Sequence, residues 1–188
     1  FGGIAMFAAY VVWWLVRVAD WPVWASVLLV VGVGAPVFGV ALDAVVFRSL
    51  RRRDAAPAEL LAASLGVLVL LIGVAYAVWG GQSRVDAPAI VPQRSFVIGA
   101  GTYVRLETLV DLAAVVVVGA GLVLAQRTRV GRSVRAVVEG RELAELSGIN
   151  TNRVAAIGWA IGSTLAALSG ILLAPSLSLD PVGLTLVM

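Results

Sequence analysis

One stretch decides the fold: VGRSVRAVVEGRELAELSGINTNR, residues 130–153. It is the longest charged island in a sequence that is otherwise strongly apolar. The segments on either side of it have the composition of membrane-spanning helices, so a polar segment of this length is expected to lie in water. There it can meet another protein.

The composition predicts a polytopic membrane protein. Of the 188 residues, 61% are hydrophobic and only 13% are charged, against about a quarter charged in soluble domains. The mean hydropathy is +1.00. Because the chain has no cysteine and no histidine, thiol nucleophiles, disulfides, imidazole bases and the usual zinc and haem ligands are excluded. We therefore expect an all-α fold with no metal site.

Five apolar stretches are candidate transmembrane helices, since a span needs roughly 20 apolar residues to cross about 30 Å of hydrocarbon. The expected spans are residues 2–16, 23–47, 60–79, 106–125 and 154–174. A turn is expected at residues 17–22, and the polar connection 80–105 shows no helical period. The chain, 1–188, is thus expected to be one transmembrane domain. Its abrupt apolar start and end predict that it is truncated at both ends.

The arginines predict the topology. All 14 basic residues are Arg, of which ten lie in the connections 48–53 and 127–153 and four lie elsewhere. The positive-inside rule places these two connections in the cytoplasm and the connection 80–105 outside. This topology explains the basic pI, so membrane lipid, and no nucleic acid, is the expected partner of the arginines.

Residues 141–146 can form a short amphipathic helix within the island. Leu143 and Leu146 are three apart and share one face, while charged residues surround the rest. Gly140 can serve as the N-cap, and Gly148 suits the left-handed residue that ends a helix. Such a helix either packs on the ends of the spans or docks in a groove on a partner, and the residues leave both open.

The last expected span carries capping and packing signals. Asn150-Thr151-Asn152 supplies N-capping side chains. Gly158 and Gly162 have the Gly-x-x-x-Gly spacing, and Gly170 follows two turns later. These glycines predict close packing against a neighbouring helix.

Asp43 and Asp111 are the carboxylates set most deeply in apolar segments, and such residues are functional candidates. An ion-coupled secondary transporter could use either one. An intramembrane protease would need both in one site. The expected topology separates their depths by on the order of 20 Å, which disfavours the protease. The remaining interpretation is that each carboxylate snorkels or pairs locally near an interface.

Several motifs fall together in the last third of the chain. They are Gly131-Arg132-Ser133-Val134-Arg135-Ala136, then Glu139, Ala144, Leu146, Gly148-Ile149-Asn150-Thr151 and Arg153, followed by LAALSGILL at 165–173. In this order they closely resemble the permease subunits of branched-chain amino-acid ABC importers, the Liv type.

The resemblance implies a multi-pass permease subunit in the cell inner (plasma) membrane that moves branched-chain or other hydrophobic amino acids inward. Its implied partners are ABC ATPase subunits, a second homologous permease subunit and an extracytoplasmic substrate-binding protein. ATP and Mg would be bound by the ATPase, and the chain indeed lacks a Gly-x-x-x-x-Gly-Lys-Ser/Thr loop. No cofactor and no enzymatic activity are therefore expected here. Similar permeases carry urea or short amides, so the substrate and the residues that bind it stay open.

In such importers a helix of a cytoplasmic loop occupies a groove on the ATPase. The resemblance assigns this role to residues 126–153, called the coupling loop below, and to its short helix. The implied ATPase-coupling residues are Glu139, Arg141, Glu142, Leu143, Ala144, Leu146 and Gly148.

Overall fold

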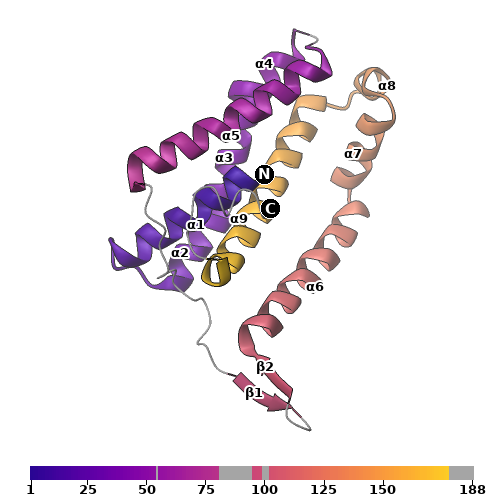
Figure 1. Ribbon diagram of the computed structural model, residues 1–188. Helices are drawn as coiled ribbons and strands as arrows, with labels where there is room; N and C mark the ends of the chain where they lie inside the picture. The colour runs from indigo at the N-terminus through magenta and orange to yellow at the C-terminus, as the bar shows by residue number, and fades with distance from the viewer. Residues whose placement is uncertain (54, 81–94, 99–101, 178–188) are drawn as a thin grey trace. The chain divides into compact units, whose positions relative to one another are not determined.

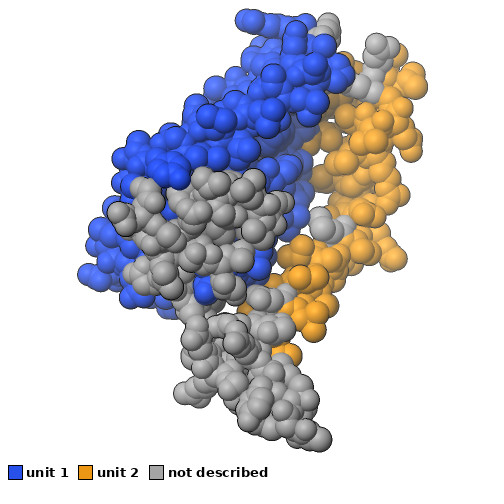
Figure 2. Space-filling model, viewed as in Figure 1, with its two compact units in different colours: residues 1–88, 155–188 blue, residues 89–154 orange. Residues whose placement is uncertain are grey.

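The computed structural model describes residues 1–53, 55–80, 95–98 and 102–177 (Figure 1). The chain divides into two compact units, 1–88 with 155–188 and 89–154 (Figure 2). The first unit holds α1 (Gly2–Arg17), α2 (Val23–Leu29), η1 (Val30–Gly34), α3 (Ala35–Leu42), η2 (Asp43–Phe47), α4 (Arg48–Arg51), α5 (Pro57–Trp79) and most of α9 (Thr151–Leu177). The second holds β1 (Ser95–Ile98), β2 (Thr102–Arg105), α6 (Leu106–Gln126), α7 (Arg129–Glu139) and α8 (Arg141–Leu146).

The segments α2 to α4 form one helix, Val23–Arg51, that contains two π-helical turns. The first, η1, leads into Pro36, which lacks an N–H and whose ring would clash with a carbonyl one turn earlier. The backbone adapts by a longer step, in which the Ala35 N–H donates to the Val30 carbonyl. In η2 the Arg48 N–H donates to the Asp43 carbonyl in the same way.

The first unit is centred on α1, of whose 16 residues nine are buried. Met6 and Tyr10 are 0% exposed and pack with Leu71 and Ala75 of α5. Trp79, at the end of α5, stacks on Tyr10 with 5.3 Å between the ring centroids. Lipid tails are as apolar as these side chains, so close packing, rather than transfer from water, holds such helices together.

Two glycines bring helices of the first unit into backbone contact. A Cβ at Gly39 of α3 would lie 2.5 Å from the Trp159 carbonyl oxygen of α9 and would also overlap the Ser163 side chain. A Cβ at Gly170 of α9 would overlap the backbone of Ala5 in α1. Both positions therefore require the absence of a side chain.

The Gly158–Gly162 pair behaves differently from Gly170. A Cβ at Gly162 would lie 2.8 Å from the ring of Phe1, whereas none of the described atoms lies within 4 Å of a Cβ at Gly158. Within the described residues, the Gly-x-x-x-Gly spacing thus contributes one packing position and not two.

The second unit begins with an antiparallel hairpin that the sequence analysis does not predict. β1 pairs with β2 so that Ser95 lies opposite Arg105 and Ile98 opposite Thr102. Phe, Val, Ile and Tyr at these positions are typical of strands. The connection 80–105 therefore contains regular structure where only a polar loop is expected.

The expected spans are all helical, with corrected ends. The second continues to Arg51, because backbone hydrogen bonding carries on after the apolar run stops, so the basic loop at 48–53 begins as helix. The fifth runs past Pro175 to Leu177, since a proline in the last turn removes only one of the final hydrogen bonds. The α5 helix begins three residues early, at Pro57, where proline is favoured.

By length and composition, three of the described helices can cross a membrane: Val23–Arg51, Pro57–Trp79 and Thr151–Pro175. A fourth span results if Leu112–Gln126 and Val130–Glu139, which meet at a bend of 73°, are counted together. The apolar α1 measures about 24 Å at 1.5 Å per residue, which is short of the hydrocarbon thickness of about 30 Å. The polytopic membrane fold is confirmed as helical apart from the β1–β2 hairpin, with three to four helices meeting the span criterion instead of five.

Candidate functional site

The coupling loop begins with a sharp junction between α6 and α7. Thr128 caps α7, since its hydroxyl oxygen accepts from the Gly131 N–H at 3.3 Å while the hydroxyl donates to the Ala125 carbonyl at 2.6 Å. A Cβ at Gly131 would lie 2.5 Å from the Ala125 carbonyl oxygen, so only glycine permits this close approach. The backbone geometry therefore requires glycine at position 131, the first residue of the Gly131–Ala136 motif.

The α7 helix is amphipathic, a feature missed by the sequence analysis, which treats its arginines as topology signals only. Val130, Val134, Val137 and Val138 follow the i, i+4, i+7, i+8 spacing of one helix face. Arg132 and Arg135 lie on the opposite face, and Arg135 donates to the Gln126 side chain at 3.2 Å. The valine spacing was the signal from which this helix could have been predicted.

The short helix α8 occupies 141–146, the range expected for the short amphipathic helix. Gly140 is its N-cap and supplies the carbonyl that accepts from the Ala144 N–H at 2.9 Å. The helix ends in a Schellman motif, in which the Ile149 N–H donates to the Ala144 carbonyl and the Gly148 N–H to the Glu145 carbonyl. Gly148 has φ +79°, which confirms the expected left-handed residue.

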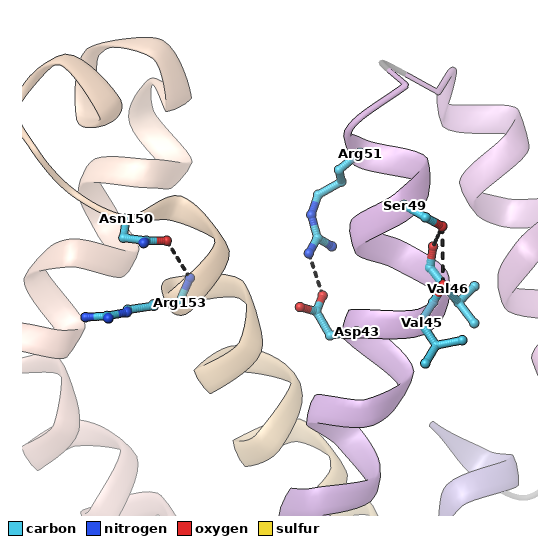
Figure 3. Close-up of polar contacts among 7 residues, drawn as sticks. All are labelled: Asp43, Val45, Val46, Ser49, Arg51, Asn150 and Arg153. Carbon is cyan, nitrogen blue, oxygen red and sulfur yellow. Dashed lines mark hydrogen bonds and ion pairs between the residues drawn. The ribbon is translucent and has the colours of Figure 1, made fainter.

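One side of α8 is attached to the start of α9. The Thr151 hydroxyl donates to the Glu145 carboxylate at 2.6 Å, and Thr151 is only 5% exposed. Asn150 caps α9 through its side-chain oxygen, which accepts from the Arg153 N–H at 3.1 Å (Figure 3). These bonds fix the orientation of α8 relative to the first turn of α9.

The opposite side of α8 is open. Ala144 is 3% exposed, whereas Leu143 and Leu146 are 71% and 84% exposed. A helix of this kind usually buries its leucines and leaves alanine outside, because each buried leucine contributes about 1.5–3 kcal/mol in water. Here the packing is reversed, and two leucines form an apolar stripe without a cover among the described residues.

The other expected coupling residues lie at the end of α7 and in the first turn of α8. Glu139 is exposed at the end of α7, next to Gly140. The backbone of Arg141 and Glu142 forms the first turn of α8, but their side chains lie outside the described part of the structure. The loop therefore presents Leu143 and Leu146, while Ala144 and Gly148 shape the backbone behind them.

Of Asp43 and Asp111, the two carboxylates set most deeply in apolar sequence, Asp43 has a partner. Its Oδ1 lies 2.6 Å from Nη2 of Arg51, eight residues later on the same helix (Figure 3). The local pairing considered from the sequence is thus observed for Asp43. The side chain of Asp111 is outside the described part.

The described residues contain no group of three or more His, Cys, Asp or Glu side chains placed to hold a metal ion.

Comparison with known proteins identifies relatives. The family described as "Branched-chain amino acid transport system / permease component" matches residues 1–188. The high-affinity branched-chain amino acid transport system permease protein LivH of Escherichia coli (strain K12) is 48% identical over 46 residues, which is 24% of this chain and 15% of that protein. LivH of Salmonella typhimurium (strain LT2) matches to the same extent. The aligned stretch thus spans under a fifth of the length of these relatives, and no solved structure matches the chain.

Proposed function

We propose that this chain, which belongs to the permease-component family of branched-chain amino acid transport systems, moves branched-chain or other hydrophobic amino acids inward across the cell inner membrane. As a member of this family it is a transport subunit and a multi-pass membrane protein. In the proposed transporter it pairs with a second homologous permease and receives solute from an extracytoplasmic binding protein. Two partner ATPase subunits bind ATP and Mg, and the chain itself has no cofactor.

The observation that carries this proposal is the reversed packing of α8. A two-leucine stripe, 71% and 84% exposed, stands on a helix whose other side is fixed by the Glu145–Thr151 hydrogen bond. Short amphipathic helices dock by placing such apolar positions in a groove on the partner. In the proposed orientation, the ten arginines of the two basic connections put this stripe on the cytoplasmic side, where an ATPase is available.

The proposal is tested by the double substitution Leu143→Asp/Leu146→Asp in the full-length permease of the assembled transporter. Two charges in an apolar groove would abolish docking, so ATP-driven uptake is expected to fall to background while the permease still reaches the membrane. The matched control is Leu143→Met/Leu146→Met, which keeps the stripe apolar and should retain most uptake. Wild-type uptake by the aspartate variant would contradict the docking role.

The choice of solute is tested separately, by competition of radiolabelled leucine uptake with leucine, urea and a short amide. Specific uptake of labelled leucine that only leucine competes supports the amino-acid proposal. Competition by urea or the amide as well would show that the permease also carries those solutes, and absence of specific leucine uptake would contradict the amino-acid proposal.

Ion coupling through Asp43 or Asp111 is the alternative mechanism. Asp43→Asn and Asp111→Asn should leave ATP dependence in place. Uptake that is lost in either variant while ATPase coupling stays intact would favour the ion-coupled mechanism.

A further inference from the structure

The end of the 23–51 helix carries a second charged feature, separate from the coupling loop. A cleft of about 370 Å³ is lined there by Ala44, Arg48, Ser49, Arg52 and Arg53. Three of the five lining residues are arginines, and none is acidic. The cleft is therefore strongly basic.

Helical spacing collects these arginines on one face. Ala44, Arg48 and Arg52 are each four residues apart, so they follow one ridge of the helix, and Ser49 and Arg53 follow the next. Arg51 projects on the side of the helix opposite Ser49 and reaches back to Asp43 (Figure 3). The one acidic residue of this helix thus neutralises Arg51 and leaves the other three arginines charged.

Within the described residues, no hydrogen bond or ion pair provides an acceptor for the guanidinium groups of Arg48, Arg52 and Arg53. Nε of Arg48 is moreover buried without a partner. A buried N–H of a charged group is unfavourable when it lacks an acceptor. An anion in the cleft would balance the charge of these three guanidinium groups.

We propose that the cleft binds the phosphate group of an anionic phospholipid. Guanidinium groups bind phosphate oxygens in pairs of parallel hydrogen bonds, and basic clusters at the ends of membrane helices lie at the depth of the headgroups. The preceding turns of the same helix expose Val37, Val40 and Val45, by 62%, 40% and 75%. The basic cleft would contact the phosphate of a phospholipid, and the exposed valines would contact its acyl chains. Free phosphate would contact the cleft alone.

The test uses the full-length permease purified in a neutral detergent and titrated with short-chain phosphatidylglycerol, short-chain phosphatidylcholine or inorganic phosphate. Binding is followed by native mass spectrometry. The site variant is Arg48→Gln/Arg52→Gln. The matched control, Arg127→Gln/Arg132→Gln, removes the same charge from exposed positions in the coupling loop.

The site variant should bind phosphatidylglycerol about 30-fold more weakly, since each arginine near a headgroup contributes about a factor of five. The control should lose much less affinity than the site variant, because Arg127 and Arg132 do not line the cleft. Arg48→Lys/Arg52→Lys, which keeps the charge but loses the paired hydrogen bonds, should lie between the two. If the glutamine variant does not fold, the lysine variant still tests the proposal, because it keeps both positive charges and changes only the hydrogen bonding.

Three results would overturn the proposal. Equal losses in the site and control variants would indicate attraction by net charge alone. Inorganic phosphate that binds as tightly as phosphatidylglycerol would identify a free anion as the ligand instead of a lipid. Phosphatidylglycerol binding unchanged in the site variant, with ATPase subunits lost on co-purification, would identify the cleft as a protein contact.

Discussion

Asp43 and Arg51 form an ion pair of 2.6 Å along a single helix, with the carboxylate side chain 3% exposed and the guanidinium side chain 19% exposed. The π-helical turn η2 begins at Asp43 and lies between the two residues. The two opposite charges lie near the end of an apolar helix and neutralise each other. Neither group is therefore left unpaired near the hydrocarbon, where an unpaired charge is costly.

The pair should show strong energetic coupling. Asp43→Leu leaves a partly buried guanidinium unpaired and is expected to destabilise the permease by about 2–3 kcal/mol, below the full cost of a broken buried pair because Arg51 keeps some solvent contact. Asp43→Leu/Arg51→Leu removes both charges and should recover most of that loss. Thermal unfolding in detergent measures both variants. Additive losses in the double variant would show that the two residues do not interact.

The contact between α1 and α9 should be sensitive at Gly170. Gly170→Val places a side chain against the backbone of Ala5, so overpacking should cost about 1–3 kcal/mol or more in stability. Gly158→Ala is the control, because none of the described atoms lies within 4 Å of its Cβ. That substitution should be neutral or stabilise by up to about 1 kcal/mol, as alanine does in helices. Equal thermal stabilities for the two variants would contradict the close contact at Gly170.

The hydrogen bond between Thr151 and Glu145 should control how firmly α8 is held. Thr151→Val removes a hydrogen bond to a charged acceptor, worth about 1.5–3 kcal/mol, so amides of residues 144–149 should exchange with deuterium about tenfold faster or more. Thr164→Val is the control, since Thr164 donates only to the Ala160 carbonyl within its own helix. Unchanged exchange in the Thr151 variant would mean that other contacts fix α8.

The left-handed backbone at Gly148 should tolerate asparagine better than alanine. Gly148→Ala places a Cβ at φ +79° and should destabilise the end of α8 by about 1–2 kcal/mol. Gly148→Asn should cost less, because asparagine adopts this conformation more readily. Uptake and amide exchange in the coupling loop provide the comparison. If the alanine variant behaves as the wild type does, the Schellman motif does not determine the shape of the loop.

Much of the fold follows from local sequence. Runs of apolar residues locate the five main helices, because the thickness of the hydrocarbon core sets the number of apolar residues that a spanning helix needs. The cap at Asn150 and the left-handed conformation of Gly148 could be predicted, because helix caps depend on the residue type at the helix end and on its immediate neighbours.

The missed features depend on relationships beyond one helical turn. Local pairing of Asp43 is expected, but its partner is not identified, because Arg51 lies eight residues away across a π-turn, outside the i+3 and i+4 rules for neighbours on a helix. Gly39 meets α9 at a position that only tertiary structure defines. Gly170 makes the close helix contact that the sequence predicts, whereas Gly158 has the spacing of a contact residue without a neighbour in the described structure. The burial of Ala144 in place of Leu143 and Leu146 likewise depends on tertiary packing, which the local sequence does not specify.

The central claim, that α8 docks on an ATPase, is tested most directly by site-specific cross-linking. Residues 1–188 contain no native cysteine, so Leu146→Cys creates a thiol that is unique within these residues. A photoactivatable reagent attached there should link the permease to an ATPase subunit in the assembled transporter. Val69→Cys, on α5 and also well exposed at 68%, should not form this link. Cross-links from position 146 to lipid or to the permease itself, with none to an ATPase subunit, would contradict the docking role.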